Sequence, residues 1–249
     1  MRTLCAELKK SRHRHNTLVA VCISLFVLLW ATQTGGTGEE RLEQGYSGLF
    51  YAVPVMNTVV MPLGTAVLAS RLLDLESKEN SCRMLLTLQS RGELFLGKAV
   101  IALLQILLIG VIECAGISAL GKHFGFTEPL DWGQLLWLAV STLTVNTMLF
   151  FLWLLLSIRF DNQVPTLAAG MVGSLSGLFA AFMSSLVSYF MPWGYYIPLS
   201  TIRMDWNRET RIVRCYYPAP YPVWLLILTA AFGALFAVLA WQVLKHKEV

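Results

Sequence analysis

One ionisable side chain stands inside a long apolar run of this sequence, and it is a carboxylate. Glu113 lies in the apolar stretch 99–120, whereas every other Lys, Arg, Asp and Glu lies outside such stretches. A carboxylate costs roughly 3 kcal/mol to place at the centre of a bilayer, so Glu113 is expected to face protein or a wet cavity. Asn57 and Asn146 lie in two other apolar runs and offer amide groups to neighbouring helices. These three residues are the candidates for a substrate path, with interhelical packing as the alternative.

The remaining residues give little support for catalysis. The apolar run 165–190 holds Ser174, Ser176, Ser184 and Ser185, but none of the apolar runs holds a His or a Lys to act as their base. The four His residues and five Cys residues show neither metal-ligand spacing nor a C-x-x-C pair. The segment 92–99 resembles a phosphate-binding loop, but Ala99 stands where a magnesium-binding hydroxyl is needed. We therefore expect no catalytic site and no bound metal or nucleotide, and keep a membrane enzyme built on Glu113 as an alternative.

The elements that would position these residues are apolar helices. Apolar side chains make up 56% of the 249 residues and charged ones 14%, with a mean hydropathy of +0.60, which leaves too little polar surface for a soluble globule. The composition therefore predicts one all-α membrane domain over residues 1–249, with no nucleic-acid partner. The runs long enough to cross about 30 Å of hydrocarbon predict six transmembrane helices. They cover residues 17–34, 47–70, 99–120, 134–158, 165–190 and 222–244.

Positive charge is divided unevenly between the two sides of these spans. Thirteen of the 19 Lys and Arg residues lie in the leader 1–16, the loop 71–98, at Arg159 and in the C-terminal tail. The positive-inside rule makes that side cytoplasmic, with both termini inside and segment 191–221 outside. The Trp and Tyr residues of 191–221 predict anchoring at the membrane interface. The leader predicts a helix on the inner membrane surface, with a solvated basic tail or a signal peptide as alternatives.

Two apolar runs carry features of helix packing. Ala169, Gly173 and Gly177 recur every four residues, a pattern that lets another helix approach closely, within the chain or at a subunit interface. Pro54 and Pro62 predict a kinked or locally opened helix over 47–70. Such a break could line a pathway or be a structural kink.

The segment 71–98 is long, cytoplasmic and still amphipathic. Its leucines need an apolar surface, whereas its acidic and basic residues need water or a charged partner. We expect a helix between the second and third spans, with a solvated helical face as the alternative. The residues that define the two characters are Leu72, Leu75, Leu86 and Phe95, against Asp74, Glu76, Lys78, Glu79 and Arg83.

On these residues the chain resembles the type-2 ABC exporter permeases, and most closely the permease subunits of lantibiotic-immunity transporters. The resemblance covers the whole length. Relatives tend to have an aromatic residue and a Lys before the paired leucines and a Pro at the turn, where this chain has Cys82, Arg83 and Gln89. The pattern is Leu73-Asp74-x-Glu76, then Leu85-Leu86, a turn at 89–92, and Lys98 at the start of the third span.

The resemblance implies a bacterial plasma-membrane permease without catalysis of its own. It implies a cytoplasmic coupling helix that docks on a separate ATPase dimer, which binds the ATP and magnesium, and a second, different six-span permease. Export of lantibiotic-like antimicrobial peptides from the membrane is the implied function. A sensor or assembly subunit, and an exporter of a lipid or drug, are the alternatives. The residues implied in coupling are Asp74, Glu76, Glu79, Arg83, Leu85 and Leu86.

Overall fold

Long helices built from the apolar runs make up most of the chain. The computed structural model describes residues 15–33, 42–77, 90–160, 162–181, 189–206 and 213–246. The long helices are α2 (Asn16–Ala31), α4 (Gly45–Ser77), α6 (Arg91–Phe124), α7 (Trp132–Arg159), α8 (Val164–Ala181) and α11 (Val223–His246). Between α8 and α11 lie the short helices η1 (Pro192–Gly194) and α10 (Tyr196–Leu199) and the strands β1 (Ile202–Trp206) and β2 (Val213–Pro218).

Local signals set the ends of α6 and α7. Ser90 Oγ accepts a hydrogen bond from the Glu93 N–H (3.3 Å), a capping arrangement that starts α6. α6 ends at Gly125, whose φ of 68° is open to glycine at little cost. Asp131 starts α7, because its carboxylate accepts hydrogen bonds from two N–H groups of the first turn (2.8 and 3.3 Å). The loop between the two helices is therefore short and fixed at both sides.

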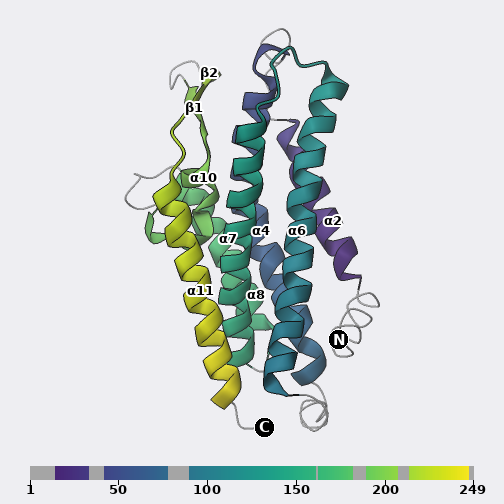
Figure 1. Ribbon diagram of the computed structural model, residues 1–249, viewed down its shortest axis with the longest axis vertical. Coiled ribbons are helices and arrows are strands. Elements are labelled where there is room, and N and C mark those ends of the chain that lie inside the picture. The colour runs from purple at the N-terminus through teal and green to yellow at the C-terminus, as the bar shows by residue number, and fades with distance from the viewer. Residues whose placement is uncertain are drawn as a thin grey trace.

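The helices lie roughly along the long axis of the molecule, with α4 at their centre (Figure 1). α4 contacts α2, α6, α7, α8 and α10, whereas α11 packs chiefly on α7. The hairpin β1–β2 and the α6–α7 loop lie at one end, which we call the hairpin end. The C-terminal ends of α4, α7 and α11 lie at the opposite end. This arrangement brings together side chains far apart in the sequence around α4.

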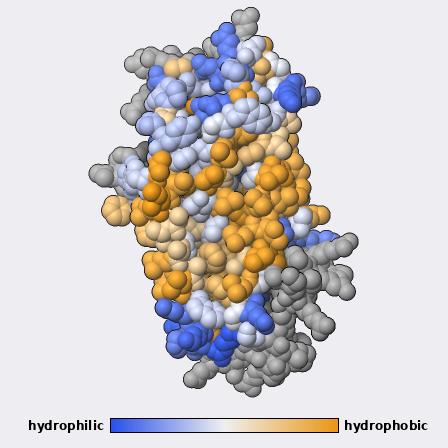
Figure 2. All heavy atoms as spheres, in the orientation of Figure 1, coloured by the Kyte–Doolittle hydropathy of each residue, from blue (hydrophilic) through white to orange (hydrophobic). Residues whose placement is uncertain are grey.

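A belt of apolar side chains circles the visible face of the molecule between two polar ends (Figure 2). Within the described residues, α4, α6, α7 and α11 are long and apolar enough to cross a membrane. α2 has 16 residues, about 24 Å, which is short of the roughly 30 Å of a hydrocarbon core, and the described part of α8 has 18 residues. The described residues thus provide four helices of membrane-spanning length and two shorter apolar ones.

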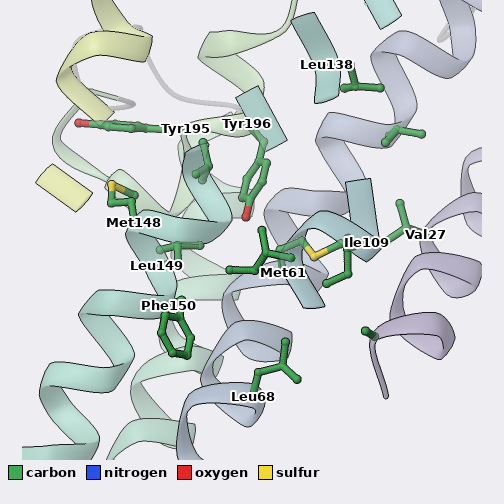
Figure 3. Close-up of a cluster of buried hydrophobic side chains, with 14 of the residues drawn as sticks. Val27, Met61, Leu68, Ile109, Leu138, Met148, Leu149, Phe150, Tyr195 and Tyr196 are labelled. Carbon is green, nitrogen blue, oxygen red and sulfur yellow. The ribbon is translucent and has the colours of Figure 1, made fainter. Parts of the chain in front are cut away.

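The core is made where α4, α6, α7 and α10 meet (Figure 3). Met61, Ile109 and Leu149 are fully buried there, each from a different long helix. Tyr196 of α10 enters the same cluster, with its hydroxyl directed toward Met61. A four-residue helix outside the predicted spans therefore contributes to the centre of the bundle.

Segment 191–221 differs from the predicted interfacial loop. Its described part holds η1, α10 and an antiparallel hairpin in which Arg203 pairs with Tyr217 and Met204 with Tyr216. The chain is mostly helical, as predicted, and this hairpin is the exception to the all-α expectation. Of the predicted span 165–190, α8 covers the part up to Ala181, and residues 182–188 lie outside those described.

The two sides of the predicted segment 71–98 are helical in the structure. α4 continues through residue 77 and α6 begins at Arg91, so both sides of that segment belong to long helices. The predicted helix of leader 1–16 falls on residues outside those described, apart from its last two positions.

The hairpin end of α4 is held by two other parts of the chain. Glu128 of the α6–α7 loop accepts hydrogen bonds from the backbone N–H (2.9 Å) and the hydroxyl of Ser47, in the first turn of α4. The Tyr216 N–H of β2 donates to the Gln44 side-chain oxygen (3.0 Å). A carboxylate at a helix N-terminus satisfies free N–H groups and complements the helix dipole. These contacts fix α4 against both the loop and the hairpin.

Candidate functional site

Four polar side chains meet inside the apolar bundle, and we call them the polar node. They are Asn57 of α4, Glu113 of α6, Asn146 of α7 and Tyr196 of α10. At most 3% of the surface of each residue is exposed. Buried polar groups in an apolar surrounding need hydrogen-bond partners, so the partners of these four side chains decide whether the arrangement is stable.

Two hydrogen bonds organise the polar node. The Asn57 amide nitrogen donates to Glu113 Oε2 (3.1 Å), which joins α4 to α6. The Tyr196 hydroxyl donates to Asn146 Oδ1 (2.6 Å), which joins α10 to α7. Both pairs are buried where α4, α6, α7 and α10 contact one another.

The two pairs together leave three buried polar atoms unsatisfied. Asn57 Oδ1 and Glu113 Oε1 are acceptors that have no hydrogen-bond partner among the described residues. Asn146 Nδ2 is a donor in the same condition. An unsatisfied buried polar atom costs about 1–3 kcal/mol, which marks the polar node as more than a packing contact.

The polar node lies deep in the bundle. Asn57, Glu113 and Asn146 are 12, 11 and 14 residues from the ends of their helices at the hairpin end. At 1.5 Å per residue these positions are roughly 16–21 Å below that end. The three helices therefore present their polar groups at a common depth, within the apolar belt.

The prolines of α4 flank Asn57. Pro54 and Pro62 lie inside one continuous helix, and the helix is not broken at either proline. Each proline removes one backbone donor from α4, and two threonine hydroxyls of the same stretch donate to backbone carbonyls one turn earlier. Thr58 donates to the Pro54 carbonyl (3.0 Å), and Thr65 to the Met61 carbonyl (2.7 Å).

Tyr196 was missed in the sequence, where segment 191–221 appeared to be an interfacial loop. Tyr195 and Tyr196 are instead buried, and the Trp137 indole N–H donates to the Leu199 carbonyl (2.8 Å), which fixes α10 on α7. Gly194 of η1 lies against Gly177 of α8, with a Cβ built on it 3.4 Å from the Gly177 Cα. The many aromatic residues of this segment were the signal that could have indicated burial, because aromatic residues also fill protein cores.

The small residues of α8 face α4 within this chain. A Cβ built on Gly173 would lie 3.6 Å from the Pro62 Cβ, and one on Gly177 would lie 3.0 Å from the Thr58 Cγ2. Gly170, which the four-residue pattern passed over, comes closest. Ala169 is partly buried against the core. The glycines allow α8 to approach the proline-containing part of α4.

The residues implied in coupling lie at the end opposite the hairpin. Asp74 and Glu76 belong to the last turns of α4. Nearby, buried Lys98 of α6 donates to the Leu72 carbonyl of α4, and Arg91 donates to the Lys245 carbonyl of α11. Three helix ends are thus tied together where the coupling segment begins. Glu79, Arg83, Leu85 and Leu86 lie outside the described residues.

Metal binding has no support in the described part of the chain, where no group of three or more His, Cys, Asp or Glu residues converges. A single carboxylate with amide and phenol neighbours can bind and orient a polar group.

Comparison with protein families gives a match over most of the chain. The family model for "ABC-2 family transporter protein" matches residues 3–177. The matched region contains α2, α4, α6 and α7 and three residues of the polar node, with only Tyr196 outside. No curated protein matches the chain. The family match shows that this protein belongs to the ABC-2 family of transporters and is a membrane permease component.

Proposed function

We propose that this chain is the permease subunit of an ATP-driven exporter that expels lantibiotic-like amphipathic antimicrobial peptides from a bacterial cytoplasmic membrane. The observation that carries the proposal is the family match, which covers the central helices and most of the polar node. ABC-2 permeases normally work with an ATPase subunit. ATP and magnesium are therefore assigned to a partner ATPase dimer.

In this proposal all six apolar helices cross or enter the bilayer, with both termini in the cytoplasm. The two shorter ones, α2 and α8, pack on α4 and need less exposed apolar length than an isolated span. The coupling residues Asp74 to Leu86 then lie on the cytoplasmic side, where an ATPase can reach them. A second, different permease completes the transmembrane dimer.

Amphipathic peptides are the substrate class that agrees best with the surfaces of the bundle. They lie at the membrane interface with an apolar face in the lipid. An exporter for them needs apolar contact together with buried polar groups that accept the peptide's polar face. The apolar belt offers the apolar contact, and the polar node offers the buried polar groups.

The test is tolerance to a lantibiotic in a sensitive bacterium. The chain is expressed with its ATPase and second permease, and the control carries a substitution in the ATPase that prevents hydrolysis. We expect the minimal inhibitory concentration to rise several-fold with the active complex and not with the control. An assembled, ATP-hydrolysing complex that gives no tolerance would point to another substrate, such as a lipid or a drug.

A further inference from the structure

We propose that the polar node binds a protonated primary amine of the exported peptide, with Glu113 Oε1 and Asn57 Oδ1 as its acceptors. This inference rests on the proposed function and names the chemical group that the permease recognises. It begins from a feature that packing does not explain, namely buried atoms that lack partners on three neighbouring helices.

The two free acceptors flank a single hydrogen bond. Asn57 Oδ1 is bonded to the carbon that carries the donating nitrogen, and Glu113 Oε1 to the carbon that carries the accepting oxygen. Each free oxygen is therefore two covalent bonds from an end of the 3.1 Å hydrogen bond between Nδ2 and Oε2. A group that satisfies both must be a hydrogen-bond donor.

The donor should also carry positive charge. A carboxylate surrounded by apolar side chains is costly unless it is paired, and Asn57 supplies only a neutral donor. Lys98 lies 15 residues before Glu113 on the same helix, roughly 22 Å along the axis. Its ammonium group donates to the Leu72 carbonyl. A positively charged ligand group therefore completes the polar node better than a neutral one.

Among positively charged groups, a primary amine fits the available oxygens best. It has three N–H donors, and the two free oxygens can accept from two of them. A guanidinium group has five donors in a fixed plane, which is more than these acceptors can satisfy. Hard metal cations take six or more oxygen ligands, which the described residues do not bring together here.

Asn146 adds a second requirement. Its free Nδ2 is a donor, so a cation alone would leave it unsatisfied. A carbonyl oxygen near the amine would accept from it. A peptide carries carbonyl groups along its backbone, beside its amino-terminal amine and its lysine side chains alike, and thus offers both groups together.

The test compares the affinities of charged and uncharged peptides for complexes with and without the Glu113 carboxylate, as in a double-mutant cycle. The complete complex in lipid nanodiscs without nucleotide is titrated with a dye-labelled amphipathic leucine–lysine peptide. Three further forms are acetylated at the amino terminus, at the lysines, or at both. The same titrations use Glu113→Gln, which keeps the side-chain shape. The control is Glu93→Gln, at an exposed acid on the same helix, where glutamine preserves the helix cap.

We expect wild type and Glu93→Gln to bind the free amine about tenfold or more tightly than the fully acetylated form, beyond the difference in empty nanodiscs, since a charge-assisted hydrogen bond contributes about that much. Glu113→Gln should remove this preference. The singly acetylated forms tell whether the amine is the amino-terminal one or a lysine's.

Equal binding of free and acetylated peptides by wild type would overturn the amine site, even if the complex still exports peptide. Binding of no peptide by the wild-type complex would overturn the peptide-export function as well. If Glu113→Gln does not assemble, the wild-type comparison of free and acetylated peptides decides the proposal without any variant.

Discussion

At the scale of single residues, one hydrogen bond determines how a carboxyl group is accommodated in an apolar bundle. Asn57 and Glu113 come from different helices, and neither has another described partner for its side chain. Removing one member leaves the other buried with nothing to bind. The energetic consequence should therefore exceed that of a surface hydrogen bond.

We predict that Asn57→Ala lowers the free energy of unfolding by about 1–3 kcal/mol, because it leaves the Glu113 carboxyl unsatisfied. The measurement is denaturant unfolding in detergent micelles. The double variant Asn57→Ala/Glu113→Ala should be less destabilised than the sum of the single variants by about 0.6–1.7 kcal/mol, the range for interhelical hydrogen bonds in membranes. Strict additivity would show that the two side chains do not interact.

A second residue-scale prediction concerns Glu128, which binds the first turn of α4 from the α6–α7 loop. Glu128→Ala should cost about 0.5–2 kcal/mol, as the loss of a helix N-cap does. Hydrogen exchange should accelerate at the Ser47 amide and in the first turn of α4. Unchanged exchange there would contradict the capping role.

The sequence identified part of the polar node at this scale. Glu113, Asn57 and Asn146 were recognisable because polar residues inside long apolar runs are costly and therefore conspicuous. Their approach to one another depends on helix rotation and depth, which a single sequence does not fix. Tyr196 was hidden because aromatic residues are common both at membrane interfaces and in cores.

At the scale of elements, the close approach of α8 to α4 depends on glycine. A Cβ built on Gly170 would lie 2.7 Å from the Ala66 Cβ and 3.4 Å from the Leu63 Cα, so one of the two helices would have to move. Gly110 of α6 differs, since a Cβ built there meets nothing within 4 Å. The two glycines form a matched pair for testing the packing.

We predict that Gly170→Ala destabilises the protein by about 1–3 kcal/mol through overpacking against α4. Gly110→Ala should be neutral or stabilise it by up to about 1 kcal/mol, because alanine favours helix. Thermal unfolding of both variants in the same detergent measures the difference. Equal effects of the two substitutions would contradict the described contact between α8 and α4.

The elements themselves were predictable to differing degrees. Hydrocarbon-length apolar runs identified the helices, but not their ends, because polar helix formers such as those of 91–98 extend them. The hairpin was missed although Ile202–Trp206 alternates apolar and polar residues, a strand signal. Its aromatic residues favoured an interfacial loop instead.

At the scale of the whole molecule, the apolar belt and the polar ends define how the protein sits in a bilayer (Figure 2). Composition alone predicted a single membrane domain, because so apolar a chain has no soluble alternative. Sidedness rests on the distribution of Lys and Arg. Partner contacts depend on surfaces of other chains, which this sequence does not contain.

We predict that the hairpin end faces outward. A membrane-impermeant thiol reagent added to intact cells should label Cys215 of β2, in a variant whose other cysteines are replaced. A cysteine introduced at Lys247 should react only after the membrane is permeabilised. Labelling of Cys215 from the cytoplasmic side alone would invert the topology and remove the coupling assignment.

We also predict that Leu85→Asp disrupts docking of the ATPase, since an unpaired carboxylate in an apolar interface costs several kcal/mol. Co-purification measures the amount of ATPase retained. Charge reversal at Glu76 should matter less, because exposed ion pairs contribute about 0–1 kcal/mol. Full retention of the ATPase by Leu85→Asp, with undiminished transport, would refute docking at this segment.

The most direct test of the whole account is peptide export by the purified complex. The chain, its ATPase and the second permease are reconstituted in proteoliposomes with the ATPase facing out, and a dye-labelled lantibiotic is bound to the outer leaflet. ATP should transfer the peptide into the vesicle lumen, where an external quencher no longer reaches it, and an ATPase unable to hydrolyse ATP should abolish the transfer. Continuous ATP hydrolysis without any protected peptide would contradict the proposed export of amphipathic peptides.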